Sequence, residues 1–161
     1  MGEKHTITCL VENHFGVLAR IAGLISARAF NIDSLTVSAT EDPTISRMTI
    51  VVDADAAKLE QVQAQLGRLI DVIEVKELKD ADFVGRDLLL VRVVVNGAKR
   101  SQLEPILQRF GAKIAEGDES SVVVEAVGKS RALDELIEAL RAFGIKKLVR
   151  TGRTALERSD K

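Results

Sequence analysis

The sequence predicts an α+β protein made of two ferredoxin-like βαββαβ modules in tandem. Two observations support this fold class. The apolar residues change between a period of two, typical of strands, and a period of three to four, typical of helices, and the same order of periods occurs twice. A charged segment without periodicity, Lys79–Asp82, separates the two series and is the best linker candidate. We therefore expect a first domain over residues 1–78, a linker over 79–85 and a second domain over 86–161.

The first module begins with a strand and a helix. Ile7, Cys9 and Val11 alternate with polar neighbours, which is the pattern of a half-buried strand, and this strand is expected to end near Glu12. A helix is predicted from Val17 onward, because apolar residues then recur at helical spacing on one face. These residues are Val17, Leu18, Ile21, Leu24 and Ile25.

A hairpin, a second helix and a last strand complete the first module. Alternation over 35–39 and again over 48–52 predicts the two strands of the hairpin. Asp53 or Asp55 is expected to cap the second helix. The apolar residues of that helix are Leu59, Val62, Leu66 and Leu69. With a strand over 70–75, the module becomes an antiparallel sheet that carries both helices on one face.

The second module repeats this order. A strand over 88–95 is apolar on nearly both faces, and Ser101–Glu104 has the S-x-x-E form of a capping box. Because proline is tolerated only in the opening turn, Pro105 requires the next helix to begin close to Ser101 or slightly later. The remaining elements are strands around 113–114 and over 122–127, a helix carrying Leu133, Leu136, Ile137 and Leu140, and a strand over 147–150.

The turn between the first strand and the first helix is the best candidate for a binding site. Only Asn13–Gly16 separates the two elements, so the first N–H groups of the helix face the space beyond the strand, where they favour an anion such as a carboxylate. An ordinary βα connection with Asn and Gly at the turn is the alternative interpretation.

Several runs of residues resemble one protein family. They are Leu10–Asn13, Gly16–Arg20, Phe30–Val37, Thr40–Pro43, Ser46–Ile50 and Leu69–Ile73, with thinner matches at Phe110–Ile114 and Arg150–Arg153. Together they are similar, over nearly the whole chain, to the regulatory small subunit of acetohydroxyacid synthase, also called acetolactate synthase. The resemblance implies that the first module is an ACT domain, whose pairs typically bind an amino acid at their interface. The chain departs from the family pattern at Phe15, Ala29 and Gly85, where the family usually has Pro, Gly and an acidic residue.

The ligand predicted for the turn is an α-amino acid. The N–H groups of Gly16, Val17 and Leu18 can hold its carboxylate, and the side-chain oxygens of Asn13 and Asn31 can accept from its ammonium group. Asn31 has a second interpretation as a turn residue that ends the preceding helix. The full set of expected effector-binding residues is Val11, Asn13, His14, Phe15, Gly16, Val17, Leu18, Asn31 and Ile32.

Other members of this set have their own expected roles. Val11, Leu18 and Ile32 favour an aliphatic side chain on the ligand, and Phe15 is expected in the pocket wall. His14 is either a surface loop residue or a group that tunes binding with pH. The family resemblance implies valine, with leucine or isoleucine as related effectors. It also implies a homodimer in which one protomer supplies Asn13 and Gly16 and the other supplies Asn31.

Composition and motifs argue against other classes of function. Lys and Arg total 23 against 24 Asp and Glu with the signs interspersed, so nucleic acid is not an expected partner. No apolar run reaches the roughly 18 residues of a membrane span, and the solitary Cys9 lies on the apolar side of a strand, so we expect a cytoplasmic protein. Gly128-Lys129-Ser130 resembles the end of a P-loop but Val123 stands where the motif needs glycine. His5, expected at a solvated strand end, and His14 lack metal-ligand spacing.

The residues themselves predict a binding module without catalytic groups, cofactor or metal of its own, and the resemblance implies a regulatory subunit. The resemblance implies that its partner is the large catalytic subunit of acetolactate synthase, which would hold thiamine diphosphate, FAD and Mg²⁺. In that case the chain activates its partner and confers feedback inhibition by valine. A free-standing amino-acid-sensing ACT dimer that regulates another partner is the alternative.

Overall fold

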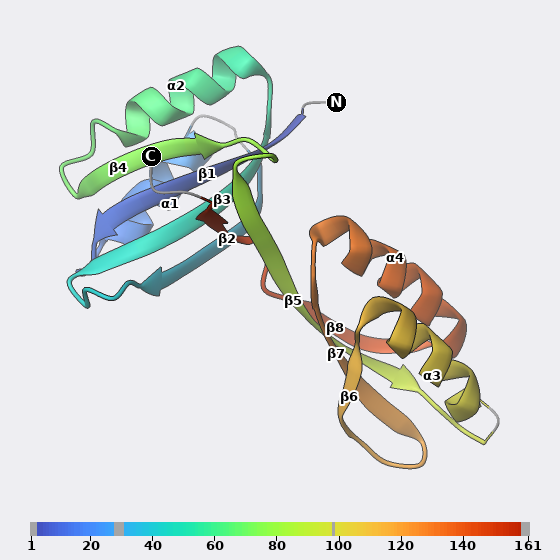
Figure 1. Ribbon diagram of the computed structural model, residues 1–161. Coiled ribbons are helices and arrows are strands. Elements are labelled where there is room, and N and C mark those ends of the chain that lie inside the picture. Colours follow the sequence, from blue (N-terminus) through green and yellow to red (C-terminus); the bar gives the residue numbers. More distant parts are fainter. Residues whose placement is uncertain (1–2, 28–30, 98, 159–161) are drawn as a thin grey trace. The chain divides into compact units, whose positions relative to one another are not determined.

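The computed structural model describes residues 3–27, 31–97 and 99–158 (Figure 1). The chain divides into two compact units, one formed by Met1–Val84 with Arg153–Lys161 and one formed by Gly85–Gly152. This division differs from the expected one, because the chain after Gly152 returns to the first unit. Both units are βαββαβ modules, which confirms the predicted fold class.

The first unit is an antiparallel sheet with strand order β2-β3-β1-β4. Its elements are β1 (Glu3–Glu12), α1 (Val17–Ala27), β2 (Asn31–Ala39), β3 (Ile45–Ala54), α2 (Ala56–Leu66), β4 (Val72–Leu78) and β9 (Thr154–Glu157). The alternation in β1 directs Ile7, Cys9 and Val11 to a face where they are at most 2% exposed. There they form one core with the buried residues of α1 and α2, so both helices cover the same face. Asp55 caps α2 by accepting from the N–H of Lys58 at 2.9 Å.

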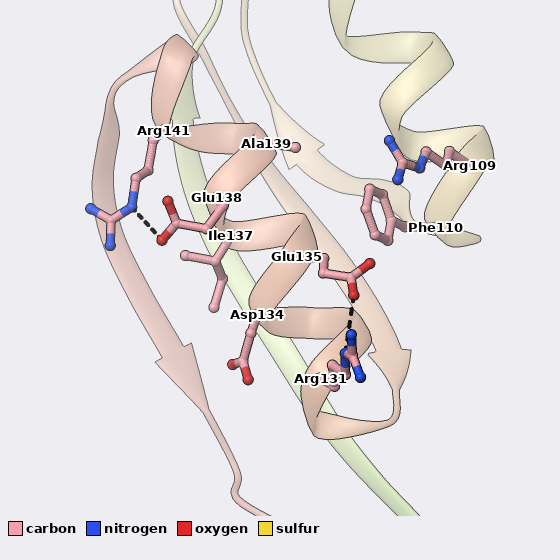
Figure 2. A pocket seen from close by; sticks show the side chains of 9 residues that line it. All are labelled: Arg109, Phe110, Arg131, Asp134, Glu135, Ile137, Glu138, Ala139 and Arg141. Atoms are coloured by element: carbon pink, nitrogen blue, oxygen red, sulfur yellow. Dashed lines mark hydrogen bonds and ion pairs between the residues drawn. The ribbon is translucent and has the colours of Figure 1, made fainter.

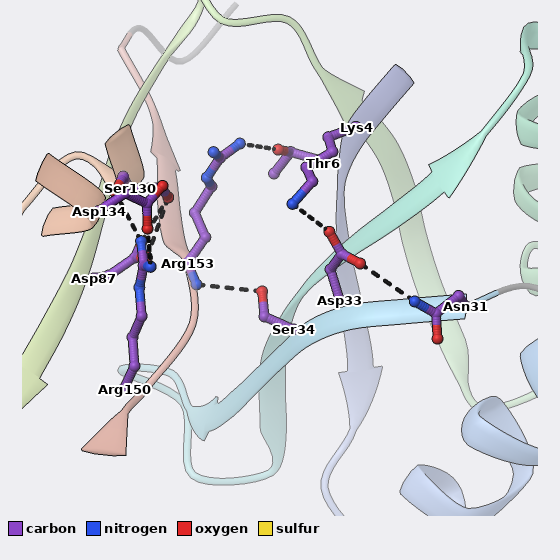
Figure 3. A network of polar contacts seen from close by, with 10 residues as sticks. All are labelled: Lys4, Thr6, Asn31, Asp33, Ser34, Asp87, Ser130, Asp134, Arg150 and Arg153. Atoms are coloured by element: carbon purple, nitrogen blue, oxygen red, sulfur yellow. Dashed lines mark hydrogen bonds and ion pairs between the residues drawn. The ribbon is translucent and has the colours of Figure 1, made fainter. Parts of the chain in front are cut away.

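The opposite face of this sheet is covered by the C-terminal segment of the chain. Arg153 donates from Nη1 to Thr6 Oγ1 at 2.6 Å (Figure 3). The N–H of Ala155 donates to Thr49 Oγ1 at 3.3 Å. Thr6, Thr8 and Thr49 are therefore buried although they lie on the polar side of the alternation. The sequence did not predict β9.

The second unit has the strand order β6-β7-β5-β8. Its elements are β5 (Phe83–Val94), α3 (Lys99–Phe110), β6 (Lys113–Gly117), β7 (Ser121–Gly128), α4 (Ser130–Leu140), a 3₁₀ turn (Arg141–Phe143) and β8 (Ile145–Arg150). The buried apolar residues of β5 and β7 form a core with Leu103 and Leu107 of α3 and with Leu133, Leu136 and Leu140 of α4.

A buried ion pair joins three elements of the second unit. Asp87 of β5, whose side chain is 4% exposed, accepts from Arg150 Nε at 2.7 Å and from Ser130 Oγ at 3.1 Å (Figure 3). Arg150 also contacts Asp134 through Nη1 at 2.6 Å. Ser130, which resembled the end of a P-loop, thus has a structural contact at the start of α4.

Several predicted boundaries were wrong. Helix α3 begins at Lys99, which makes Ser101 its third residue and not a cap, and Pro105 lies beyond the opening turn at an exposed position of the helix. Strand β4 begins at Val72 and not at residue 70, because a turn that includes the exposed Ile70 precedes it. The segment without regular structure is limited to 79–82, since β5 already begins at Phe83.

Candidate functional site

The β1–α1 turn has a fixed backbone shape. The N–H of Asn13 donates to the carbonyl oxygen of Thr44 at 2.7 Å, and Asn13 Nδ2 donates to the carbonyl oxygen of Pro43 at 2.9 Å. This orientation leaves the Asn13 Oδ1 atom available as an acceptor. Gly16 has a φ of +87°, a conformation that side chains strain, and its carbonyl oxygen accepts from the N–H of Arg20 at 2.9 Å.

Helix α1 therefore starts immediately after Gly16. The N–H groups of Val17, Leu18 and Ala19 come before the first i to i−4 bond, so they have no acceptor within the helix. No acidic residue occupies the first turn of α1 to satisfy them. N–H groups without an acceptor at a helix start are the feature from which the sequence analysis predicted a carboxylate site.

A cluster of charged side chains ties the turn to the start of β4. Asp71, whose side chain is 8% exposed, contacts Arg20 Nη1 through Oδ2 at 2.5 Å and His14 Nε2 through Oδ1 at 3.0 Å. The same His14 atom lies 3.3 Å from Glu12 Oε2. The backbone is joined as well, because the N–H of Glu12 donates to the carbonyl oxygen of Asp71 at 2.9 Å. The sequence analysis did not select Glu12, Arg20 or Asp71, since these residues come together only through the pairing of β1 with β4.

His14 is exposed, and its neighbours raise its pKa. The carbonyl oxygen of Phe15, 3.1 Å from His14 Nδ1, raises the pKa of the imidazole, and the carboxylates of Asp71 and Glu12 act in the same direction while desolvation opposes them. His5, in contrast, lies largely buried with its Nδ1 atom 2.9 Å from Glu77 Oε1, so the expectation of a solvated strand end was wrong.

The apolar members of the predicted site are not all available to a ligand. Val11 and Val17 are buried in the core of the first unit, so only their backbone atoms can take part. Leu18 is 44% exposed and Ile32 is partly buried. Phe15 is fully exposed and contributes no wall within one chain. Ala29, one of the departures from the family pattern, lies outside the described residues.

Asn13 and Asn31 lie at opposite ends of the sheet. Glu12, which precedes Asn13, pairs with Ile45, whereas Asn31 pairs with Asp53 at the far end of β3. The eight steps between these two β3 residues correspond to roughly 27 Å at about 3.4 Å per residue. Asn31 Nδ2 donates to Asp33 Oδ1 at 3.4 Å, and Asp33 in turn pairs with Lys4 (Figure 3). One chain thus does not bring the two predicted ammonium acceptors together.

The second unit carries an open groove of about 760 Å³ between the end of α3 and the surface of α4 (Figure 2). Its charged side chains have partners outside the groove or near them in sequence: Arg131 pairs with Glu135, Arg141 with Glu138, and Asp134 with Arg150 of β8. Arg109 lies over the ring of Phe110. Because these groups do not converge on a common point, the groove has no features of a specific ligand site.

In the ranges that the structure describes, no helix is long and apolar enough to cross a membrane.

Both units of the chain match known protein families. Residues 7–74 match the family described as the AHAS small subunit-like ACT domain, and residues 86–159 match the family described as the small subunit of acetolactate synthase. The first unit is therefore an ACT domain, a regulatory type of module.

Individual relatives extend this similarity to the whole chain. A probable acetolactate synthase small subunit of Archaeoglobus fulgidus is 44% identical over 158 residues, which covers 98% of this chain and 99% of the relative. The acetolactate synthase small subunit of Mycobacterium bovis is 42% identical over 159 residues, which covers 99% of this chain and 95% of the relative. A crystal structure of the acetolactate synthase small subunit from Thermotoga maritima has a TM-score of 0.90 at 28% identity and covers 99% of both chains. The chain belongs to the family of acetolactate synthase small subunits, which are regulatory and non-catalytic, and the resemblance seen in the sequence is confirmed.

Proposed function

We propose that two copies of this chain bind a branched-chain amino acid, with valine as the first expectation, and thereby regulate the catalytic subunit of acetolactate synthase. The observation that carries this proposal is the β1–α1 turn. It combines the unpaired N–H groups at the start of α1 with the acceptor Oδ1 of Asn13. A carboxylate and an ammonium group on one small molecule match these two features.

The position of Asn31 supports a dimeric site. Strand β2 is an edge of the sheet and pairs only with β3, so its other edge is available to a second copy. Asn31 begins β2, and Ala39 ends it beside Ser46, at the same end of the sheet as Asn13. Antiparallel pairing of β2 with the β2 strand of a second copy would therefore carry the partner's Asn31 toward the turn of the first copy. A symmetric dimer would contain two such sites.

The surroundings of the turn favour an aliphatic ligand. Leu18 presents an exposed side chain on the first turn of α1, and Ile32 follows Asn31 on β2. In the proposed dimer these two residues come from different protomers. Arg20 lies near the start of the helix, and its positive charge would also attract a carboxylate. Its guanidinium group is already paired with Asp71.

The regulated partner follows from the names of the relatives. A small subunit requires a large one, and we assign thiamine diphosphate, FAD and Mg²⁺ to that catalytic partner. A cytoplasmic location is part of this proposal. The isolated chain should produce no acetolactate from pyruvate with these cofactors, whereas its addition should raise the activity of the catalytic subunit and make it sensitive to valine.

Calorimetric titration with valine, leucine and isoleucine tests the binding step directly. We expect saturable binding of at least one of them and a dimer by light scattering at micromolar protein. A stable monomer that binds none of the three amino acids would overturn the proposal. Turnover by the demonstrably pure chain would overturn the regulatory role.

A further inference from the structure

We propose that Glu12, His14 and Asp71 form a binding site for one divalent transition-metal ion of the Zn²⁺ class. Their ligand atoms, two carboxylate oxygens and one imidazole nitrogen, all lie within 4.8 Å of one another. The two distances from His14 Nε2 are 3.0 Å to Asp71 Oδ1 and 3.3 Å to Glu12 Oε2. Ligands about 2.0–2.1 Å from a tetrahedral ion are separated by roughly 3.3 Å, so both carboxylate oxygens already lie at a suitable distance from His14 Nε2, and rotation of the exposed Glu12 side chain can adjust the separation of the two oxygens.

The hydrogen bond on the other side of the imidazole points to a cation. A carbonyl oxygen can only accept, so the contact with the Phe15 carbonyl at 3.1 Å makes His14 Nδ1 the donor. In the neutral ring, the lone pair of Nε2 then faces two carboxylate oxygens. Either a proton on Nε2, which makes His14 an imidazolium that pairs with both carboxylates, or a metal ion that replaces this proton can hold the three groups together. A backbone carbonyl on the second ring nitrogen is also the usual way to orient a histidine that binds a metal.

Arg20 helps to position the ligands without occupying the site. It contacts Oδ2 of Asp71, while Oδ1 faces His14, so the two oxygens of this carboxylate have separate partners. Asp71 is held in place by burial, whereas Glu12 and His14 have side chains that are 56% and 47% exposed and are open to an ion from solvent. Two carboxylates and one guanidinium leave a local charge of −1, which a divalent ion reverses.

The ligand types select the class of metal. One imidazole nitrogen with two carboxylate oxygens suits Zn²⁺, Co²⁺ or Ni²⁺ better than Mg²⁺ or Ca²⁺, which prefer oxygen ligands alone. With three protein ligands, a fourth position stays open to water or to another small ligand. This site could not be found from the sequence alone, because Asp71 is far from the other two ligands along the chain.

His5 provides a matched control. It also lies beside a carboxylate, with Nδ1 2.9 Å from Glu77 Oε1. Among the described residues, Glu77 is the single acidic partner of His5. A histidine with one carboxylate is an ordinary ion pair, whereas His14 with two is a ligand set. Substitution by glutamine at each position removes the imidazole and keeps a polar side chain.

The test is calorimetric titration of the untagged chain with ZnCl₂ and CoCl₂, together with the visible absorption spectrum of the Co²⁺ form. We expect one ion per chain, at least a tenfold loss of affinity in His14→Gln and in Glu12→Gln, and unchanged affinity in His5→Gln. The Co²⁺ absorption bands should be lost in His14→Gln only. Thermal melts without metal check that each variant is folded, which the exposure of Glu12 and His14 favours.

Three results would overturn the metal site. They are the absence of saturable binding up to millimolar metal, a folded His14→Gln that binds as tightly as the wild type, or an equal loss in His5→Gln. Binding of amino acids is measured separately and without metal, so the failure of one proposal leaves the other intact.

Discussion

The two units of this chain have the same topology but different surfaces. In each, the second, third, first and fourth strands lie side by side in that order, and both helices share one apolar core with the sheet. The units differ in the turn that follows their first strand and in what lies on the opposite face of the sheet. The comparison teaches that the βαββαβ topology builds a core, while these two features provide specific chemistry.

The first difference concerns the turn. In the first unit, Gly16 lies directly before α1, and the cluster around Asp71 connects the turn to β4. In the second unit, the corresponding connection contains Gly97, also with positive φ, and Arg100 donates from Nη1 to the carbonyl oxygen of Asp118 at 3.4 Å. A buried carboxylate like Asp71 is absent from the contacts described there. The two turns thus differ in the charged groups that surround them, although both lead into a helix.

The second difference concerns the outer face of the sheet. In the first unit it is covered by the C-terminal segment and buries hydroxyl groups such as Thr6 and Thr49. In the second unit, Val127 of β7 and Val149 of β8 stay 57% and 64% exposed. The stability of the second unit therefore depends more on its helical core and on the ion pair of Asp87 with Arg150.

The largest expected effect is the loss of that ion pair. Asp87→Ala leaves Arg150, whose side chain is only 23% exposed, without its buried partner, and should lower the free energy of unfolding by about 3–5 kcal/mol. Urea denaturation followed by circular dichroism measures the loss, and hydrogen exchange should locate it in β7 and α4. Asp134→Ala is the control, because Asp134 contacts the same arginine but is 63% exposed, and should cost less than about 1 kcal/mol. Equal costs would show that burial of the pair does not matter.

The next prediction compares valine binding after a glycine substitution in each of the two units. Gly16→Asp places a carboxylate beside the proposed position of the effector carboxylate, and should weaken valine binding at least about tenfold, or roughly 1.4 kcal/mol. Gly111→Asp in the second unit is the matched control. Gly111 also has a positive φ, +62°, so both variants carry backbone strain, but Gly111 follows α3 and is no part of the β1–α1 turn.

Calorimetry with valine on both variants, alongside thermal melts, distinguishes the outcomes. Unchanged affinity in a folded Gly16→Asp would place the effector elsewhere. An equal loss in both variants would attribute the effect to strain and not to the site.

A smaller effect tests the C-terminal cover of the first unit. Arg153→Ala removes the hydrogen bond to Thr6 and the contact with the ring of Phe83 at 5.8 Å, and should cost about 1–2 kcal/mol of unfolding free energy. Arg131→Ala in the second unit removes a side chain that is 93% exposed and paired only along its helix, so it should cost about 0.5 kcal/mol or less. Urea denaturation of both variants provides the measurement, and equal midpoints would mean that the C-terminal segment does not stabilise the sheet.

Most of the fold was predictable because it is local. The alternation of Ile7, Cys9 and Val11 and the helical spacing from Val17 onward are direct consequences of which face is buried, so strand β1 and helix α1 were found with their ends nearly correct. The start of α3 was predicted too late because Pro105 was expected to lie in the first turn of the helix. An exposed proline is accommodated beyond the first turn when the helix is held by Leu103 and Leu107.

The contacts that depend on distant pairing were not predictable from local pattern. Strand β9 is short and has no clear alternation, and it is defined by its contacts with the first unit. Asp71 joins the β1–α1 turn only because β4 pairs with β1. Asn13 and Gly16 were selected from the sequence because turn chemistry is local, whereas the partners of His14 depend on tertiary structure.

The last prediction uses the rate at which Cys9 is modified as a reporter of how often the core of the first unit opens. In one of the two variants compared, this rate is expected to stay unchanged. Burial raises the pKa of this thiol from 9.0 to about 12, so the folded chain should react very slowly with a thiol reagent at pH 8, while the chain in urea reacts fully. The raised pKa also means that the thiol stabilises the folded state below pH 9, and that this contribution is lost as the pH rises toward 12, since only the unfolded chain ionises there.

If the two units open independently, the variants should separate in this assay. Arg153→Ala loosens the cover of the first sheet and should speed the modification of Cys9 by roughly five- to thirtyfold, which corresponds to about 1–2 kcal/mol. Asp87→Ala destabilises the second unit far more, yet it should leave the rate unchanged. A large acceleration in Asp87→Ala would show that the two units unfold together. The protection of Cys9 would then report the stability of the whole chain and not of the ACT domain alone.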